Sequence, residues 1–307
     1  MKVFITGATG YIGYSVALAF RRAGYYVSGL IRNPKKTWML ESHEIHPILG
    51  DLHKPETYGE AVRGSSLIVH AAADYTVDRA AVDRSVLQMV MSVSEQQSRP
   101  KTFIYTSGCW VYGNTGTTAA SEAAPLNPSI AARWRPAVEQ EVLQASGLRT
   151  VIVRPGCVYG KQGGLMSMWF DGVINKNDLR VVGDGSNRWS LVHVDDLADA
   201  YVRIAERRAT GSIFNIADGS QQTVGEMVQT IAQATGYTGT ITYVPVEEAA
   251  TTLGSLAESL ALDQHLDARK AAEELGWHPH HNGFAEDAEA YLMAWKGTLR
   301  TNSPSLL

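Results

Sequence analysis

The sequence predicts an α/β fold, a doubly wound parallel sheet with a smaller C-terminal α/β lobe. Short apolar runs alternate with helix-like segments over the first two thirds of the chain, as they do in successive βαβ units. Two of these runs, residues 67–69 and 151–153, are apolar without interruption, as in strands that are buried on both faces. A glycine-rich turn at residues 7–13 joins the first strand to the first helix, which indicates a Rossmann-type sheet.

The turn after the first expected strand (residues 2–5) has the spacing of a phosphate-binding loop. Gly7 permits the tight turn, Gly10 lets the backbone approach a pyrophosphate, and Gly13 lets the helix at 11–22 pack closely on the sheet. The helix N-terminus offers N–H groups and a positive dipole to phosphates. A glycine turn that binds nothing is the alternative, and the strand–turn–helix context disfavours it. The cofactor contacts expected in this loop are Gly7, Thr9, Gly10, Tyr11, Ile12 and Gly13.

The end of the second strand (residues 25–31) indicates which dinucleotide is bound. Folds that prefer NAD usually carry an acid there, which holds the ribose hydroxyls. Here the strand ends at Ile31, and the basic segment Arg32-Asn33-Pro34-Lys35-Lys36 follows it. A solvated basic loop is one interpretation, but with the acid missing we favour NADP(H) over NAD(H), because Arg32 and Lys36 suit a 2′-phosphate.

The ends of the third and fourth strands (44–49 and 66–70) complete the expected nucleotide site. Asp51, followed by Leu52, is placed to accept from the adenine amine. The small residues Ala71, Ala72 and Ala73 let a nucleotide lie against the backbone.

The rhythm of the chain changes after residue 160, where glycine-rich turns interrupt shorter elements. We predict a dinucleotide-binding domain over residues 1–160, to which residues 190–217 return, and a smaller substrate-binding lobe over residues 161–189 and 218–307. The remaining expected strands cover residues 102–106, 149–153, 213–216 and 240–244, and the expected helices cover 77–97, 131–145 and 194–207.

Composition excludes several classes of partner. The net charge of −4 gives no electrostatic footprint for nucleic acid or an anionic membrane surface. No apolar run reaches the roughly 18 residues of a membrane span. Met1 leads directly into a strand, so we expect no signal peptide and a cytoplasmic location. The two cysteines, Cys109 and Cys157, predict neither a disulfide framework nor a metal site.

Further motifs follow in a fixed order, and with them the chain resembles the extended short-chain dehydrogenase/reductase family, which includes NAD-dependent epimerases and dehydratases. The resemblance implies a nicotinamide-binding Rossmann domain, a smaller substrate domain and further cofactor contacts at Thr106 and Pro155. The motifs that carry it are residues 7–13, 50–52, 69–72, 105–107, 111–113, 153–160, 191–198 and 275–279.

The family's catalytic residues are a Tyr that serves as acid and base, a Lys four residues later on the same helix face, and a Ser or Thr. When the sequence is aligned on Val138-Glu139, Ala131 stands at the Tyr position and Arg135 at the Lys position. Gly108 stands at the Ser/Thr position, with Ser107 just before it. The family's Asn on the fourth helix corresponds to Asp83. We therefore expect an atypical member that lacks the Tyr-x-x-x-Lys pair.

Three residues are our catalytic candidates. Arg135 keeps a positive charge that can hold the ribose hydroxyls, although a guanidinium does not release its proton at neutral pH. Proton transfer therefore needs another group, and we name Ser107 and Tyr75, which follow the fifth and fourth strands. For a second set of candidates we favour a structural role: Cys109, Tyr112, Tyr159 and His193.

Cationic residues near the expected cleft suggest an anionic substrate. Arg133, Trp134 and Arg135 could bind a carboxylate or phosphate, and a solvated Arg133 is an equal alternative. Lys161 and Arg188 stand at the edges of the second lobe, where an Arg of the family often meets a phosphate, and surface exposure would also explain both.

Three functions remain open. The first is an NADP(H)-dependent oxidoreductase that acts on a carbonyl or alcohol of a small organic substrate. The second is a catalytically inactive NADP(H)-binding regulator, and the third is a nucleotide-sugar epimerase or dehydratase. The helices at 77–97 and 131–145 resemble those that pair in family dimers, so a homodimer is expected.

Overall fold

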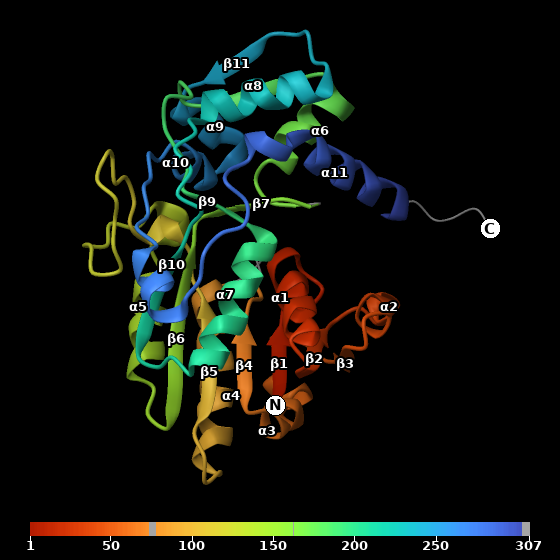
Figure 1. Cartoon of the computed structure of the whole chain (residues 1–307), viewed down its shortest axis with the longest axis vertical. Helices are drawn as coiled ribbons and strands as arrows, with labels where there is room; N and C mark the ends of the chain where they lie inside the picture. The colour runs from red at the N-terminus through yellow and green to blue at the C-terminus, as the bar shows by residue number, and fades with distance from the viewer. Residues whose placement is uncertain (74–77, 162, 303–307) are drawn as a thin grey trace, which may run out of the picture.

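A seven-stranded parallel sheet forms the centre of the larger part of the molecule, as the computed structural model shows (Figure 1). The structure describes residues 1–73, 78–161 and 163–302. The strand order β10-β6-β5-β4-β1-β2-β3 reverses direction between β1 and β4, which is the doubly wound topology expected from the sequence. The predicted fold class is therefore confirmed. The strands are β1 Lys2–Thr6, β2 Tyr26–Ile31, β3 His46–Leu49, β4 Leu67–His70, β5 Lys101–Thr106, β6 Leu148–Pro155 and β10 Ser212–Ile216.

Helices cover both faces of this sheet, because alternate strand residues point to opposite sides. Val3 and Ile5 pack on the face covered by α1 and α7, which lie in front of the sheet in Figure 1. Phe4 packs on the opposite face with α3, α4 and α5. The bounds are α1 Tyr11–Arg22, α2 Trp38–Glu41, α3 Gly59–Gly64, α4 Arg79–Glu95, α5 Arg135–Gln144 and α7 Val194–Arg207.

The second lobe lies above the C-terminal ends of the strands in Figure 1 and has its own apolar core. Two short parallel pairs support it, β7 with β9 and β11 with β8. Its elements are β7 Cys157–Tyr159, α6 Ser167–Lys176, β8 Leu179–Val182, β9 Leu191–His193, α8 Val224–Thr235, β11 Ile241–Val244, α9 Val246–Leu253, α10 Leu256–Leu260 and α11 Ala288–Asn302.

Two helical segments differ from what the sequence suggests. The helix expected from residue 131 begins as α5 at Arg135, after a short 3-10 turn at Ile130–Ala132. Pro136 fits the first turn of α5, where a missing N–H costs no hydrogen bond. The helical turn Ala271–Leu275 packs with α7 in the sheet's core rather than with the second lobe. The domain boundaries given above stay a prediction.

Among the described residues, no helix is both long and apolar enough to cross a bilayer. An ion pair between Arg84 of α4 and Glu141 of α5 joins the two helices through which a homodimer is expected, with an N–O distance of 2.8 Å. The dimer itself stays a prediction.

Candidate active site

The loop between β1 and α1 is closed by close backbone contacts. Gly10 donates its N–H to the Gly7 carbonyl at 2.8 Å, and Gly7 has a φ of +74°. A Cβ on Gly7 would lie 2.8 Å from the backbone of Ala71 and Ala72, and one on Gly13 would lie 2.2 Å from the Gly7 carbonyl oxygen. The atoms nearest to Gly13 belong to the loop at Gly7 and Ala8. Glycine is therefore required at position 13 because α1 starts against this loop, whereas the sequence suggested packing on the sheet. Gly10 is exposed, and Thr9 and Ile12 are half-buried, so this turn offers backbone to a ligand.

The residues expected around the adenosine lie at the ends of β2 and β3. Arg32 and Lys36 are exposed after β2, and Asp51 is half-buried after β3. Asp51 accepts the N–H of His53 at 3.0 Å, which fixes its carboxylate in the loop beside half-buried Leu52. Ala71, Ala72 and exposed Ala73 follow β4. Their contacts with a nucleotide stay a prediction.

A pocket of about 350 Å³ lies where the glycine loop, the end of β5 and the second lobe meet. It contains Tyr11 and Ile12 from the loop, Pro155 from the end of β6, and two catalytic candidates, Ser107 and Arg135. The third candidate, Tyr75, lies outside the described residues. The pocket is also lined by Arg79, Gly108, Cys109, Trp110, Ala131, Ala132, Gly156, Cys157, Val158, Gly164 and Leu165.

Ser107 presents an unused hydroxyl at this pocket. Its side chain is 5% exposed, and its Oγ has no hydrogen-bond partner among the described residues. The backbone N–H of Ser107 donates to the Val153 carbonyl at 2.8 Å, so the residue is held in place while its hydroxyl is not. A buried hydroxyl without a partner loses hydrogen-bond free energy, which a ligand oxygen in the pocket would restore.

Arg135 lies at the start of α5 and reaches the end of β5. Its Nη1 donates to the Thr106 carbonyl at 2.9 Å, and its guanidinium lies 4.7 Å from the ring centre of Trp134. The Thr106 hydroxyl is used separately, in a 2.7 Å hydrogen bond with Tyr201. Ala131, which the sequence analysis expects at the family's Tyr position, gives the same pocket only a methyl group.

A buried polar row lies under the site, and the sequence reasoning missed most of it. His70 Nδ1 lies 2.7 Å from the Thr6 hydroxyl, and His70 Nε2 lies 2.9 Å from Asp83. Tyr105 donates to the other oxygen of Asp83 at 2.6 Å. His70 Nε2 and the Tyr105 hydroxyl thus contact the two carboxylate oxygens of Asp83. The row joins β1, β4 and β5 to α4, and Asp83 is thereby structural.

Two other candidates, Tyr112 and Tyr159, make structural contacts. Tyr112 accepts from Arg154 at 2.7 Å and donates to Asn215 at 2.8 Å. Tyr159 accepts the Gly283 N–H at 3.1 Å, and burial followed by the charge of Asp218 raises its pKa. Both phenols are thus held by hydrogen bonds to other parts of the chain.

His193 closes the N-terminus of α7. Its Nδ1 accepts the Asp195 N–H at 3.2 Å, and its ring stacks on His281 at 3.6 Å between centres. Burial, and then the charge of His281, lowers the pKa of His193 to about 4. A neutral imidazole is the form that can accept this cap hydrogen bond, which gives His193 a structural contact at the start of α7.

Two of the suggested anion ligands are paired with carboxylates. Lys161 lies 2.5 Å from Asp195, and Arg188 makes a two-pronged ion pair with Asp263 at 3.0 and 3.1 Å. Arg133 is exposed and does not line the pocket. Of the suggested cations, only Arg135 lies at the pocket. Among the described residues, no three His, Cys, Asp or Glu side chains are grouped so that they could hold a metal ion.

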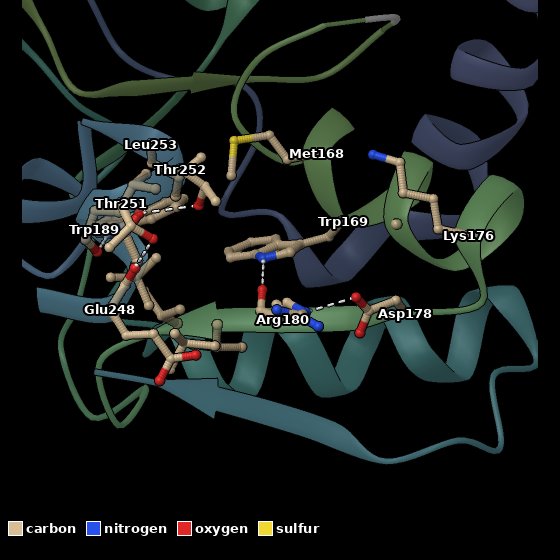
Figure 2. A pocket seen from close by; sticks show the side chains of 17 residues that line it. Met168, Trp169, Lys176, Asp178, Arg180, Trp189, Glu248, Thr251, Thr252 and Leu253 are labelled. Carbon is tan, nitrogen blue, oxygen red and sulfur yellow. Dashed lines mark hydrogen bonds and ion pairs between the residues drawn. The ribbon is translucent and has the colours of Figure 1, made fainter. Parts of the chain in front are cut away.

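A second pocket of about 280 Å³ lies inside the C-terminal lobe (Figure 2). Trp169 stacks on Trp189 with ring centres 5.2 Å apart and donates its indole N–H to the Arg180 carbonyl at 3.0 Å. The cations at its rim, Lys176 and Arg180, are paired with Asp171 and Asp178. It shares no lining residue with the pocket at Ser107, so it is separate from the nucleotide loop.

Comparison with known proteins establishes the family. A model of the NAD dependent epimerase/dehydratase family matches residues 3–217. The chain therefore belongs to this family, within the extended short-chain dehydrogenases/reductases, and its resemblance is confirmed. The family is oxidoreductase-like and includes ketoreductases, dehydrogenases and epimerases among the relatives of this chain.

Individual relatives are distant but extend over most of the chain. An uncharacterized protein of Schizosaccharomyces pombe is 27% identical over 95% of this chain and 100% of that protein. A 4-hydroxy-2-methyl-3-oxo-4-farnesyl-3,4-dihydroquinoline-1-oxide ketoreductase of Stigmatella aurantiaca is 25% identical over 85% of this chain and 80% of the ketoreductase. The structure of a Bacillus anthracis dTDP-glucose 4,6-dehydratase in complex with NAD matches 98% of both chains with a TM-score of 0.82 and 19% identity, which shows the shared fold.

Proposed function

We propose that this chain is an NADP(H)-dependent oxidoreductase that acts on a carbonyl or alcohol of a small organic substrate, with non-standard catalytic residues. The observation that carries the proposal is the pocket in which the unpartnered Ser107 hydroxyl and the Arg135 guanidinium lie beside the glycine loop. The family membership and the similarity to a ketoreductase support it.

The bound nicotinamide would supply hydride transfer, and the chain's residues would bind, orient and polarise. The glycine loop and the α1 N-terminus would hold the pyrophosphate, as the close backbone contacts at Gly7 and Gly13 leave Gly10 exposed. Arg135 would donate to the ribose hydroxyls while it stays bonded to Thr106. Ser107 would donate its hydroxyl proton in a hydrogen bond to the substrate oxygen, where negative charge develops on reduction.

The preference for NADP(H) rests on the basic segment after β2. Arg32 and Lys36 are exposed there, and no acid ends the strand. Affinities for NADPH and NADH test this preference in the wild type and in Arg32→Asp. We expect tighter NADPH binding in the wild type and a shift toward NADH in the variant. Equal affinities of the wild type for both nucleotides would contradict the preference.

The activity is tested with NADPH or NADH and a panel of aldehydes, ketones and quinones, followed by the absorbance of the reduced nicotinamide. We expect NADPH-dependent turnover that falls in Ser107→Ala and in Arg135→Ala. Nucleotide binding without turnover on the whole panel would favour the second candidate instead.

That second candidate is a catalytically inactive NADP(H)-binding regulator, and one observation favours it. Ala131 lines the pocket with a methyl group where the family has its acid and base. A nucleotide-sugar epimerase or dehydratase ranks third, because Arg188, suggested as a phosphate ligand, is held by Asp263.

A further inference from the structure

The pocket of about 350 Å³ beside the glycine loop combines positive charge with apolar walls. Arg79, at the start of α4, and Arg135, at the start of α5, both line it. No Asp or Glu stands among the described residues that line the pocket, and its apolar walls include Ile12, Trp110 and Leu165. Such a lining fits a ligand that is apolar over most of its surface and carries a negative charge at one group.

Two hydrogen-bond donors of this pocket keep their protons at neutral pH. The Ser107 hydroxyl is buried and has no partner among the described residues. Arg135 has five N–H groups, and its one hydrogen bond within the described residues runs from Nη1 to the Thr106 carbonyl at 2.9 Å. A guanidinium stays charged at neutral pH, and an aliphatic hydroxyl holds its proton about as firmly as water does. Both groups can therefore stabilise a negatively charged ligand oxygen without neutralising it.

Tyr11, the phenol among the described lining residues, is held in a different contact. Its hydroxyl donates to the Gly160 carbonyl at 2.8 Å, and a Cβ on Gly163 would lie 2.5 Å from its ring. Burial, followed by the charge of Asp195, raises the pKa of Tyr11 well above its usual value. Tyr11 therefore keeps its proton, and stabilisation of a ligand oxygen falls to Ser107 and Arg135.

We infer that Ser107 and Arg135 form a phenolate site, and that the substrate reduced there is a quinone. The second half of this inference rests on the proposed function. The quinone accepts hydride from the reduced nicotinamide: one C–H bond breaks there, one bond to hydrogen forms on the quinone, and two electrons move with it. The product is a hydroquinone monoanion, whose negative oxygen Ser107 and Arg135 would hold. A proton from water then completes the hydroquinone.

The acidity of the product distinguishes a quinone from a simple ketone. A phenol such as the tyrosine side chain has a pKa of about 10, whereas water, a model for an aliphatic alcohol, has one of about 15.7. Reduction of a simple ketone therefore leaves an alkoxide that needs a general acid at once. A hydroquinone anion spreads its charge over the ring and persists without one. Donors that stabilise an oxygen but keep their protons suit the quinone.

Binding of 4-nitrophenol in the absence of nucleotide tests the phenolate site. Its phenolate form absorbs visible light strongly, so the absorbance reports the ionised fraction. At the pH where half of the free probe is ionised, we expect saturating wild-type protein to raise this fraction to about nine tenths, because charge-assisted hydrogen bonds favour the phenolate about 10-fold. 4-Nitroanisole, which has a similar shape and no ionisable hydroxyl, should bind about 10-fold more weakly than the phenolate.

Variants assign this effect to the two donors. Ser107→Ala and Arg135→Ala should each bring the ionised fraction of the bound probe back toward that of the free probe. Arg133→Ala, at an exposed residue that does not line the pocket, should leave the fraction as in the wild type. Ser107→Ala removes no hydrogen bond within the described residues, so it tests the site even if Arg135→Ala fails to fold. A bound probe that is no more ionised than the free probe, as a merely apolar pocket would give, or absence of binding would overturn the inference.

Turnover with NADPH tests the choice of substrate. We expect 1,4-naphthoquinone to be reduced roughly 100-fold faster than cyclohexanone, each rate corrected for the reaction without protein. Equal rates would show that the pocket supplies a proton, from Cys109, Cys157 or another group, and would overturn the quinone assignment while the proposed oxidoreductase stands. Turnover of neither compound, with ionised 4-nitrophenol in the pocket, would overturn the proposed oxidoreductase together with the quinone assignment and leave the phenolate site.

Discussion

Arg135 donates from Nη1 to the backbone carbonyl of Thr106 at 2.9 Å, and this hydrogen bond joins the first residue of α5 to the last residue of β5. Ser107 follows Thr106 directly, so the guanidinium positions the segment that carries the unpartnered hydroxyl. The stacking on Trp134 at 4.7 Å fixes the plane of the guanidinium. One side chain thus supports the pocket wall and also lines the pocket.

Arg135→Ala should weaken NADPH binding by about 10-fold or more, because a hydrogen bond from a charged donor contributes about 1.5–3 kcal/mol. The NADPH affinity of Arg135→Lys should lie between those of Arg135→Ala and the wild type, since lysine keeps the charge and lacks the planar guanidinium. Titration of NADPH fluorescence measures both. Arg133→Ala is the matched control, because Arg133 is exposed and does not line the pocket. An equal loss of affinity in Arg133→Ala would refute the assignment to Arg135.

Ser107→Ala should lower turnover by about 100-fold and leave the free energy of unfolding unchanged or slightly higher. The hydroxyl makes no hydrogen bond to the described residues, so its removal loses none and relieves an unsatisfied buried group. Chemical denaturation and steady-state turnover on the same preparations check the two halves of this prediction.

Ser94→Ala is the matched control for Ser107→Ala. Ser94 is also buried, but its Oγ donates to the Gly147 carbonyl at 2.9 Å and accepts the Lys101 N–H at 3.2 Å. Its loss should cost about 1–3 kcal/mol of stability and leave turnover unchanged. If Ser107→Ala instead destabilises the chain to the same extent and keeps full turnover, the Ser107 hydroxyl is structural.

The sheet and the nucleotide loop could be predicted because their signals are local in the sequence. Strands buried on both faces need continuous apolar runs, such as the one in β4. Gly7, Gly10 and Gly13 belong to one turn of backbone. Gly10 and Gly13 both lie close to the Gly7 carbonyl, which explains the spacing of the three glycines. The row from Thr6 to His70 and Tyr105 could also have been found, since the three are register partners near the ends of neighbouring parallel strands.

The catalytic half of the site could not be predicted in the same way, because its contacts join distant parts of the chain. Tyr112 is held by hydrogen bonds with Arg154 of β6 and Asn215 of β10. Arg188 is paired with Asp263, which lies 75 residues further along the chain and which no local pattern indicates. Whether a hydroxyl such as that of Ser107 lacks a partner depends on every neighbour at once.

Gly13→Ala should destabilise the chain by about 1–3 kcal/mol and weaken dinucleotide binding. A Cβ at this position would lie 2.2 Å from the Gly7 carbonyl oxygen and 2.7 Å from its carbon, so the loop backbone must move. In an exposed helix the same change usually stabilises by about 1 kcal/mol. Gly64→Ala serves as the control, since nothing lies within 4 Å of its added Cβ at the end of α3. Equal effects of the two changes, measured by thermal unfolding, would rule out the steric explanation.

The buried His193 should make stability depend on pH between about 6.5 and 4. Burial and the neighbouring His281 lower its pKa to about 4, so the unfolded chain binds this proton more readily than the folded chain. Stability therefore falls as the pH drops through this window and is constant with respect to this group below it. Asp195, Asp196 and Lys161 also face the imidazole, and the first two oppose the shift.

His193→Asn should remove this dependence, because an Asn side chain can still accept the Asp195 N–H at the start of α7. Between pH 7 and pH 4.5 we expect the wild type to lose about 2 kcal/mol more stability than the variant. Urea unfolding at the two pH values measures the difference. His43→Asn, a change at an exposed position, should lose as much stability between the two pH values as the wild type does. If His193→Asn loses as much stability on acidification as the wild type, another group must take up the proton, and the lowered pKa of His193 is wrong.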